Sequence, residues 1–191
     1  MASWCSTARA CSAAIAAVVL FTSCRQRELP VYKTVPRFSL TSQTGQAFDS
    51  SSLNGSVWVA DFFFTNCTGP CPRMSSRFRQ IQKSFPSAPD LKFVSITVDP
   101  ARDTPAVLTE YARKFSAEPG RWLMLTGPVE TLQNLSRQVF MLGDIQGDLT
   151  HSTRFVLMDR KSQIRGFYQS NEPESIQQLT KDIQLLLKEK T

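Results

Sequence analysis

The chain has 191 residues, of which 41% are hydrophobic and 20% are charged, as in a soluble globular protein with one well-formed core. The formal net charge is +6 at pH 7, but Lys and Arg are scattered and no nucleic-acid-binding motif occurs, so no nucleic-acid partner is expected. Two interpretations of the charge stay open, a solvated and mildly basic surface or a basic face for an acidic partner.

A short secretory signal is predicted at the N-terminus. Arg9 precedes an apolar run over residues 11–21, which is too short to span the ~30 Å hydrocarbon core of a bilayer as a helix. The run leads into Leu-Phe-Thr-Ser-Cys, which resembles a bacterial lipobox with Cys24 as the diacylated residue. We therefore expect residues 1–24 to be a signal and lipid anchor that holds the protein at the extracytoplasmic (periplasmic) face of a bacterial membrane. An uncleaved anchor and simple secretion are the alternatives.

The next segment separates this signal from a folded domain. Residues 25–36 are polar and contain two prolines, so they are predicted to form a tether before a domain over residues 37–191. The domain is expected to open with a β-hairpin whose strands include residues 38–40 and Phe48, joined by a turn at residues 44–46.

The longest apolar run of the domain, residues 57–64, is typical of a central strand buried on both faces. Strands and helices then alternate. The expected helices cover residues 72–85, 105–115, 129–140 and 173–190, and the expected strands cover residues 91–98, 122–125, 153–158 and 164–168. This order predicts an α/β fold with a central mixed β-sheet flanked by helices and an N-terminal β-hairpin. A cysteine pair between the first long strand and its helix is the thioredoxin arrangement, so the predicted fold is thioredoxin-like.

Only two cysteines belong to the predicted mature domain. Cys5 and Cys11 lie in the signal and Cys24 is the predicted lipid site, which leaves Cys67 and Cys71. A disulfide between residues so close in sequence closes almost no loop, so it would add little as a framework bond.

The spacing of Cys67 and Cys71 allows both sulfurs to face one point. Cys71 is predicted at the start of a helix, where free N–H groups and the helix dipole favour the thiolate. Such a pair can form a redox-active disulfide or bind a soft metal such as Cu(I), zinc or an iron–sulfur cluster. A structural disulfide or two inert buried thiols is the alternative interpretation.

His151 is the only histidine of the chain, and it directly precedes a predicted strand. A lone histidine is more often structural than a ligand, and its isolation excludes a zinc site built from two or three histidines. Together with the two cysteines it would make a set of two thiolates and one imidazole, which suits copper in either oxidation state.

Three segments of the chain resemble the signature blocks of the Sco/SenC family. Residues 64–72, Phe-Thr-Asn-Cys-Thr-Gly-Pro-Cys-Pro, resemble Phe-Thr-x-Cys-Pro-x-x-Cys-Pro, and residues 98–105 match Val-Asp-Pro-x-Arg-Asp-Thr-Pro. In the third block, His151 precedes a strand that ends in Asp159, and Gly-Phe-Tyr follows at residues 166–168. The blocks occur in the family's order over nearly the whole mature domain.

The resemblance implies a site and its cargo. Cys67, Cys71 and His151 would bind one Cu(I) or Cu(II) ion per chain, and the two cysteines would form a redox-active disulfide when oxidised. Asp99, in the second block, is a candidate for orienting the site or contacting a partner, although an aspartate there also caps the turn that Pro100 forms.

The implied function is a copper metallochaperone for the copper A centre in subunit II of cytochrome c oxidase. Other periplasmic copper chaperones and thiol reductants are further candidate partners. The main alternative is a thiol–disulfide reductase that acts on the cysteines of the oxidase copper site through the same two sulfurs. A copper sensor or buffer and a thiol peroxidase are smaller alternatives.

Two residues depart from the family pattern. Thr68 stands where the family usually has Pro, and Thr150 stands where it usually has Asp before the histidine. The first change is expected to loosen the loop between the cysteines, and the second to remove a partner that orients His151.

Other polar and soft residues near these motifs have structural interpretations. Arg102 and Asp103 are expected to form a surface ion pair. Met74 is a possible soft ligand, but it falls in helical phase with Phe78 and Ile81, which favours a core position.

Overall fold

The computed structural model describes residues 1, 28–142 and 152–189. The strands are β1 (Lys33–Thr34), β2 (Ser39–Ser42), β3 (Ala47–Asp49), β4 (Val57–Phe63), β5 (Leu91–Thr97), β6 (Trp122–Thr126), β7 (Arg154–Met158) and β8 (Gln163–Gln169). The helices are α1 (Pro70–Ser84), α2 (Pro105–Lys114), α3 (Val129–Asn134) and α4 (Pro173–Lys188), with a 3₁₀ turn η1 (Ser50–Leu53) and a π-helical segment η2 (Leu135–Val139).

All eight strands join one mixed sheet in the order β1-β8-β7-β4-β5-β6-β2-β3. The central strands β4, β5 and β6 are parallel, whereas β7 pairs antiparallel with β4, and β2 pairs antiparallel with β6. Strand β4 lies in the middle and is buried along its whole length, as its apolar run predicts. The predicted mixed sheet with its leading hairpin, β2 and β3, is confirmed.

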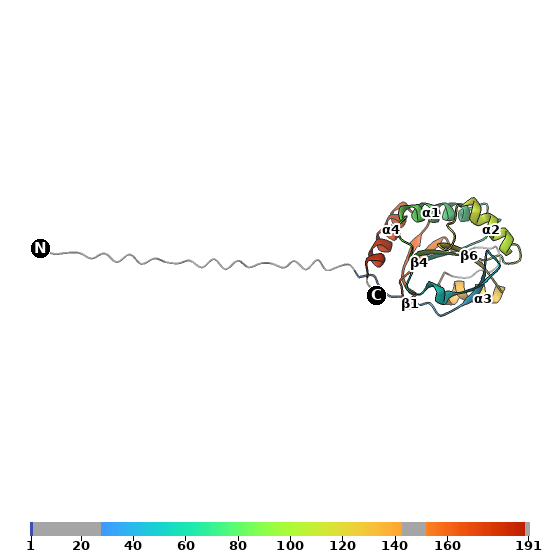
Figure 1. Ribbon diagram of the computed structural model, residues 1–191, viewed down its shortest axis with the longest axis horizontal. Helices are drawn as coiled ribbons and strands as arrows, with labels where there is room; N and C mark the ends of the chain where they lie inside the picture. The colour runs from blue at the N-terminus through green and yellow to red at the C-terminus, as the bar shows by residue number, and fades with distance from the viewer. Residues whose placement is uncertain (2–27, 143–151, 190–191) are drawn as a thin grey trace.

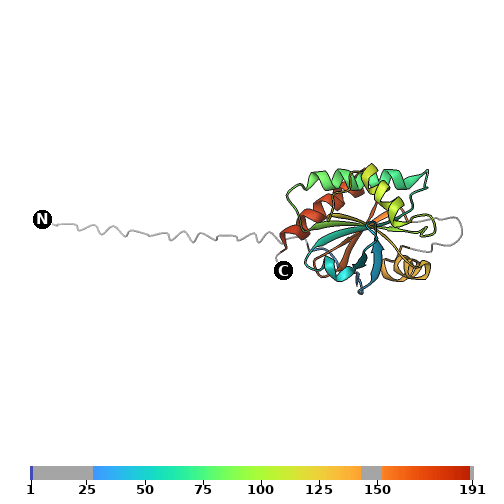
Figure 2. The ribbon, with the colours of Figure 1, turned by 45° about the vertical axis from the view of Figure 1, so that its right-hand side comes forward.

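Helices cover both faces of the sheet (Figure 1). Helices α1, α2 and α4 lie on one face, and α3 with η2 lies on the other (Figures 1 and 2). Alternate residues of β4 point to opposite faces, so Val59 packs under α1 while Trp58 packs against η2. On the α1 face the core includes Phe78 and Phe93, whose rings lie 5.2 Å apart.

One predicted helix differs in its second half. The expected helix over residues 129–140 is α-helical only to Asn134 and continues as the π-helical segment η2. The wider turn is closed by the Phe140 N–H, which donates to the Leu135 carbonyl at 2.8 Å. It places the Phe140 ring edge-on to Trp58 and Phe62, at centroid distances of 6.0 and 5.5 Å.

Part of the segment that was predicted as a tether packs on the domain. Leu29 and Val35 are buried, and β1 pairs with β8 and forms one edge of the sheet. The Arg165 guanidinium donates to the carbonyls of Leu29 and Pro30, at 2.8 and 3.1 Å. No helix among the described residues combines the length and apolarity needed to cross a bilayer.

Candidate functional site

The two cysteines lie beyond the carboxyl end of the central strand, as predicted. Cys67 is on the loop from β4 to α1, and its N–H donates to the Phe64 carbonyl at 3.3 Å. Cys71 is the second residue of α1, which begins at Pro70, two residues earlier than the sequence predicted. Proline is well accepted at a first helical position because the N–H it lacks would have no helical partner there. Both cysteines are free thiols in this structure.

The two thiols have different environments. Cys67 is partly exposed, whereas Cys71 has no solvent-accessible surface and points into the core with Met74 and Phe78. The inward position of Met74 confirms the prediction that it packs in the core. Cys67 is therefore the cysteine with access to solvent, and Cys71 has none.

The prediction that the helix N-terminus favours a Cys71 thiolate is wrong for this dithiol form. Burial raises the pKa of the Cys71 thiol far above its ordinary value, and the adjacent Cys67 thiol and the charge of Asp61 raise it further. Desolvation of the charged form outweighs the helix dipole, because the sulfur lies inside the packed core. Cys71 is therefore protonated at neutral pH in this dithiol form.

This asymmetry predicts selective alkylation. At neutral pH and with a limiting amount of a maleimide, Cys67 is expected to react at least about tenfold faster than Cys71, because reactivity follows exposure and thiolate content. Cys67 and Cys71 lie on one tryptic peptide, residues 38–73, so its fragment ions in tandem mass spectrometry would measure the ratio, with a Cys67→Ser variant as the control for Cys71 alone. Equal rates at the two positions would contradict the buried placement of Cys71.

Asp103 ties the cysteine loop to the neighbouring loop between β5 and α2. Its carboxylate is fully buried and accepts from the Thr65 hydroxyl at 2.5 Å and from the Thr65 N–H at 3.2 Å. The Thr97 hydroxyl also donates to it. The expected surface pair between Arg102 and Asp103 is wrong, because Arg102 pairs with Asp99 and Asp103 turns inward. Asp103 thereby holds Thr65, which is 38 residues away in sequence and lies two residues before Cys67.

Asp99 lies at the end of β5, beside the loop that carries Cys67. Its carboxylate is nearly buried and forms an ion pair with the exposed Arg102 at 3.4 Å, and its backbone N–H donates to the Thr97 hydroxyl oxygen at 3.0 Å. The carbonyl of Asp99 also accepts from the N–H of Asp103 at 2.9 Å. These contacts fit the turn-capping interpretation, and a role for Asp99 beside a metal ion stays a prediction.

A buried acidic residue, Asp61, was not anticipated as part of the site. It lies in β4 on the same face as α1, opposite Ser95 of β5, and has no exposed surface. Burial raises its pKa to about 7, and the Ser95 hydroxyl offsets part of that rise. Its charge also raises the pKa of Cys71 and Tyr111, which places these three groups within electrostatic reach of one another. The only sequence signal is an aspartate inside an otherwise apolar strand.

Two predicted site residues cannot be placed. His151 and Cys24 lie outside the described residues, as does Thr150. Among the residues that the structure describes, no three Cys, His, Asp or Glu side chains gather as a metal-binding group. The structure thus brings together Cys67 and Cys71, with Asp61 and Asp103 nearby, and the third predicted ligand stays a prediction.

The comparisons with known proteins agree with this architecture. Residues 26–188 match the family model described as SCO1/SenC. The chain is 35% identical to the SCO1 protein homologue of Bacillus subtilis over 99 residues, which is 51% of each chain. The matched region therefore spans about half the length of that relative.

Solved structures match over most of their length. A SCO1/SenC family lipoprotein from Bacillus anthracis is 32% identical, with a TM-score of 0.73 over 80% of this chain and 94% of that one. BsSco, an oxidase assembly protein in which a disulfide switch was identified, is 26% identical, with a TM-score of 0.74 over 86% and 98%. Copper-bound ScoI of Arabidopsis thaliana is 26% identical, with a TM-score of 0.67 over 80% and 99%. These matches confirm the thioredoxin-like fold, and the chain belongs to the SCO1/SenC family.

Proposed function

We propose that this protein is a copper metallochaperone that carries one copper ion per chain for assembly of the copper A centre of cytochrome c oxidase. The observation that carries the proposal is the pair of adjacent free thiols at the carboxyl end of β4. Two thiolates are the ligands that Cu(I) prefers, and they lie where open α/β sheets place their sites. The copper-bound Arabidopsis relative and the oxidase-assembly role of BsSco support the assignment.

The unequal exposure of the two thiols suits an ion that must be held and then released. A thiolate or imidazole of an acceptor can approach Cu(I) from the side of Cys67 and displace that sulfur first. Cys71 would keep the ion within the protein until the acceptor has supplied a second ligand. In this scheme His151 is the third ligand, and it releases the copper ion together with Cys67.

The second candidate function is a thiol–disulfide reductase that acts on the cysteines of the oxidase copper site. The Cys67 sulfur would attack a partner disulfide to give a mixed disulfide, and Cys71 would then displace the partner. The products are a Cys67–Cys71 disulfide and two partner thiols, so two electrons pass to the partner. The exposed and buried arrangement of the thiols and the disulfide switch of BsSco favour this candidate.

We also propose that Cys24 is lipidated and holds the domain at the periplasmic face of a bacterial membrane. The lipobox-like sequence supports this, as does the lipoprotein of Bacillus anthracis among the similar structures. An anchor raises the effective concentration of the domain near a membrane-bound oxidase.

A Cu(I) competition titration tests the metallochaperone. The reduced full chain, kept in neutral detergent without oxygen, would be titrated against a chromophoric Cu(I) chelator, with His151→Ala beside it. One tightly bound ion per chain is expected, and the substitution is expected to weaken it at least about tenfold, or about 1.4 kcal/mol.

The titration separates the candidates. Tight binding that His151→Ala leaves unchanged would support copper as the cargo and contradict the three-ligand site. Absence of competitive binding would contradict the metallochaperone and leave the reductase, for which the imidazole is not needed. Thr68→Pro and Thr150→Asp, which restore the family pattern, would then show whether the two departures are responsible.

A further inference from the structure

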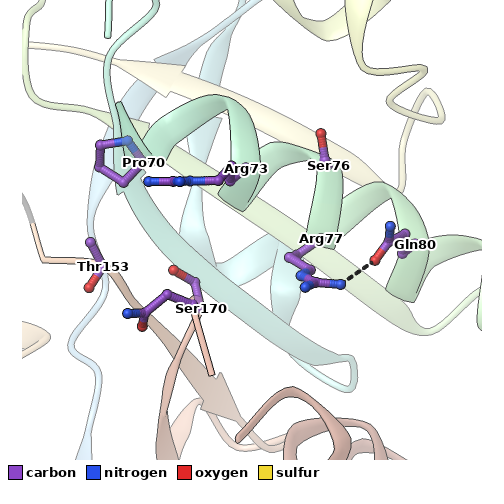
Figure 3. A pocket seen from close by; sticks show the side chains of 8 residues that line it. Pro70, Arg73, Ser76, Arg77, Gln80, Thr153 and Ser170 are labelled. Atoms are coloured by element: carbon purple, nitrogen blue, oxygen red, sulfur yellow. Dashed lines mark hydrogen bonds between the residues drawn. The ribbon is translucent and has the colours of Figure 1, made fainter. Parts of the chain in front are cut away.

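A pocket of about 510 Å³ adjoins the cysteine motif along the outer side of α1. Pro70, which lies between the two cysteines, forms one end, and Arg73 and Arg77 of α1 form one wall. Thr153, just before β7, and Ser170, just after β8, face the arginines across it (Figure 3). Any group that enters this α1 pocket lies beside the loop of the partly exposed Cys67.

The segment that contains α1 carries charge of one sign. Residues 62–89 contain four basic residues and no Asp or Glu, although the whole chain carries 16 acidic residues. All four lie in α1, at positions 73, 77, 79 and 83. Arg77 is held by a hydrogen bond of 2.9 Å to the neutral Gln80 side chain, so its charge is positioned but not neutralised.

The arginines of α1 differ from most others in the domain. Six arginines elsewhere form ion pairs with carboxylates: Arg37, Arg102, Arg113, Arg121, Arg160 and Arg165. None of the ion pairs within residues 28–142 and 152–189 involves Arg73 or Arg77. Within these described ranges, the pocket therefore contains two guanidinium groups that form no ion pair.

Helix stability does not account for these charges. Arg73 lies in the first turn of α1, where a cation opposes the helix dipole and an acidic residue would be favoured. Arg73 and Arg77 are four residues apart on one helix, and like charges at that spacing repel each other. The arrangement raises the energy of the isolated helix, and an anionic partner would relieve it.

We propose that the α1 pocket is a docking site for carboxylate side chains on an acidic segment of the protein that exchanges copper or electrons with Cys67. The proposal rests on the proposed function and names the surface chemistry of its partner. Arg guanidinium groups bind carboxylates through paired hydrogen bonds, and the pocket is large enough for side chains to enter. Because the pocket ends at Pro70, a docked segment would bring the rest of its protein next to the accessible sulfur.

The position favours a protein over a lipid surface. A membrane bound at the α1 pocket would cover the loop of Cys67, which is the thiol that an acceptor must reach. Complementary charge at the rim of an interface mainly accelerates association, and its effect falls as salt increases. That behaviour suits a carrier that must meet its partner quickly and then leave.

The test uses a fluorescein-labelled hexaglutamate peptide as the probe and the reduced, copper-free full chain in neutral detergent. Fluorescence anisotropy would measure binding, and the rate of maleimide addition to Cys67 would report whether the bound peptide lies beside the thiol. The double variant Arg73→Glu/Arg77→Glu is expected to weaken peptide binding at least about tenfold and to remove the protection of Cys67. Arg79→Glu on the same helix changes the charge outside the pocket and is expected to weaken binding less than about threefold.

The outcomes are distinct from those of the copper titration, because this test contains no metal. Equal losses of peptide affinity in the double variant and in Arg79→Glu, or peptide binding without protection of Cys67, would overturn the proposed docking site. Neither result would bear on copper binding. Arginine-dependent binding to phosphatidylglycerol-containing vesicles, with none to the peptide, would identify a membrane surface and also overturn the proposal. If copper binding fails while the peptide result holds, the docking site stands and its partner is a reductase substrate.

Discussion

Replacing Cys71 with Ala is expected to weaken Cu(I) binding by at least about a thousandfold, or about 4 kcal/mol. The substitution removes one of the two proposed thiolate ligands, and the thioethers of Met74 and Met124 in the same core cluster are weaker ligands than a thiolate. Because Cys71 has no exposed surface, Ala preserves the apolar environment better than Ser does. The chelator competition on the reduced chain measures the loss.

A matched variant separates the ligand role from the packing role. Cys67→Ala is expected to lose copper to a similar degree with less change in the free energy of unfolding, because Cys67 is partly exposed. Denaturant unfolding of both copper-free variants provides the comparison. If Cys71→Ala kept tight copper binding in a folded chain, the buried thiol would not be a ligand and the metallochaperone would lose its main support.

Much of the fold is predictable from the sequence because its signals are local. The apolar run at residues 57–64 and the helical phase of residues 74, 78 and 81 report burial directly. Asp103 or Thr104 before Pro105 predicts the start of α2, and of these two residues Thr104 is the cap, because its hydroxyl accepts from the Val107 N–H. The π-helical segment η2, which follows α3, has no local sequence signal. It depends on where the Phe140 ring fits against Trp58 and Phe62 of β4.

The candidate site is predictable only in part. Cys67 and Cys71 are found from spacing, but the burial of Cys71 follows from the early start of α1 at Pro70. The positions of Asp61 and Asp103 depend on contacts between strands and loops that are distant in sequence. Sequence reasoning assigned Asp103 to a local ion pair with Arg102, because adjacent opposite charges are the simplest pattern available. In the fold, the buried Asp103 carboxylate instead accepts hydrogen bonds from three donors. These stabilise a carboxylate more than one exposed ion pair would.

Replacing Asp103 with Ala is expected to destabilise the protein by about 2–4 kcal/mol, because the hydrogen bonds of Thr65 and Thr97 lose their buried acceptor. The same change frees the loop that carries Cys67, so copper affinity is expected to fall about tenfold in protein that is still folded. Denaturant unfolding and the chelator competition measure the two effects. Asp49→Ala is the control, since that carboxylate, at the end of β3, pairs with the exposed Arg37.

A double-mutant cycle with Thr65→Val determines whether Asp103 acts through the cysteine loop. If the Thr65 contact carries the effect, Asp103→Ala and Thr65→Val are expected to weaken copper binding by less together than the sum of their separate effects. Additive effects on copper affinity would show that Asp103 supports the fold without positioning Cys67. The cycle matters because stability alone cannot separate these roles, whereas coupling measured on bound copper reports the geometry of the exposed sulfur. A positive result would connect the second family block, residues 98–105, physically to the first.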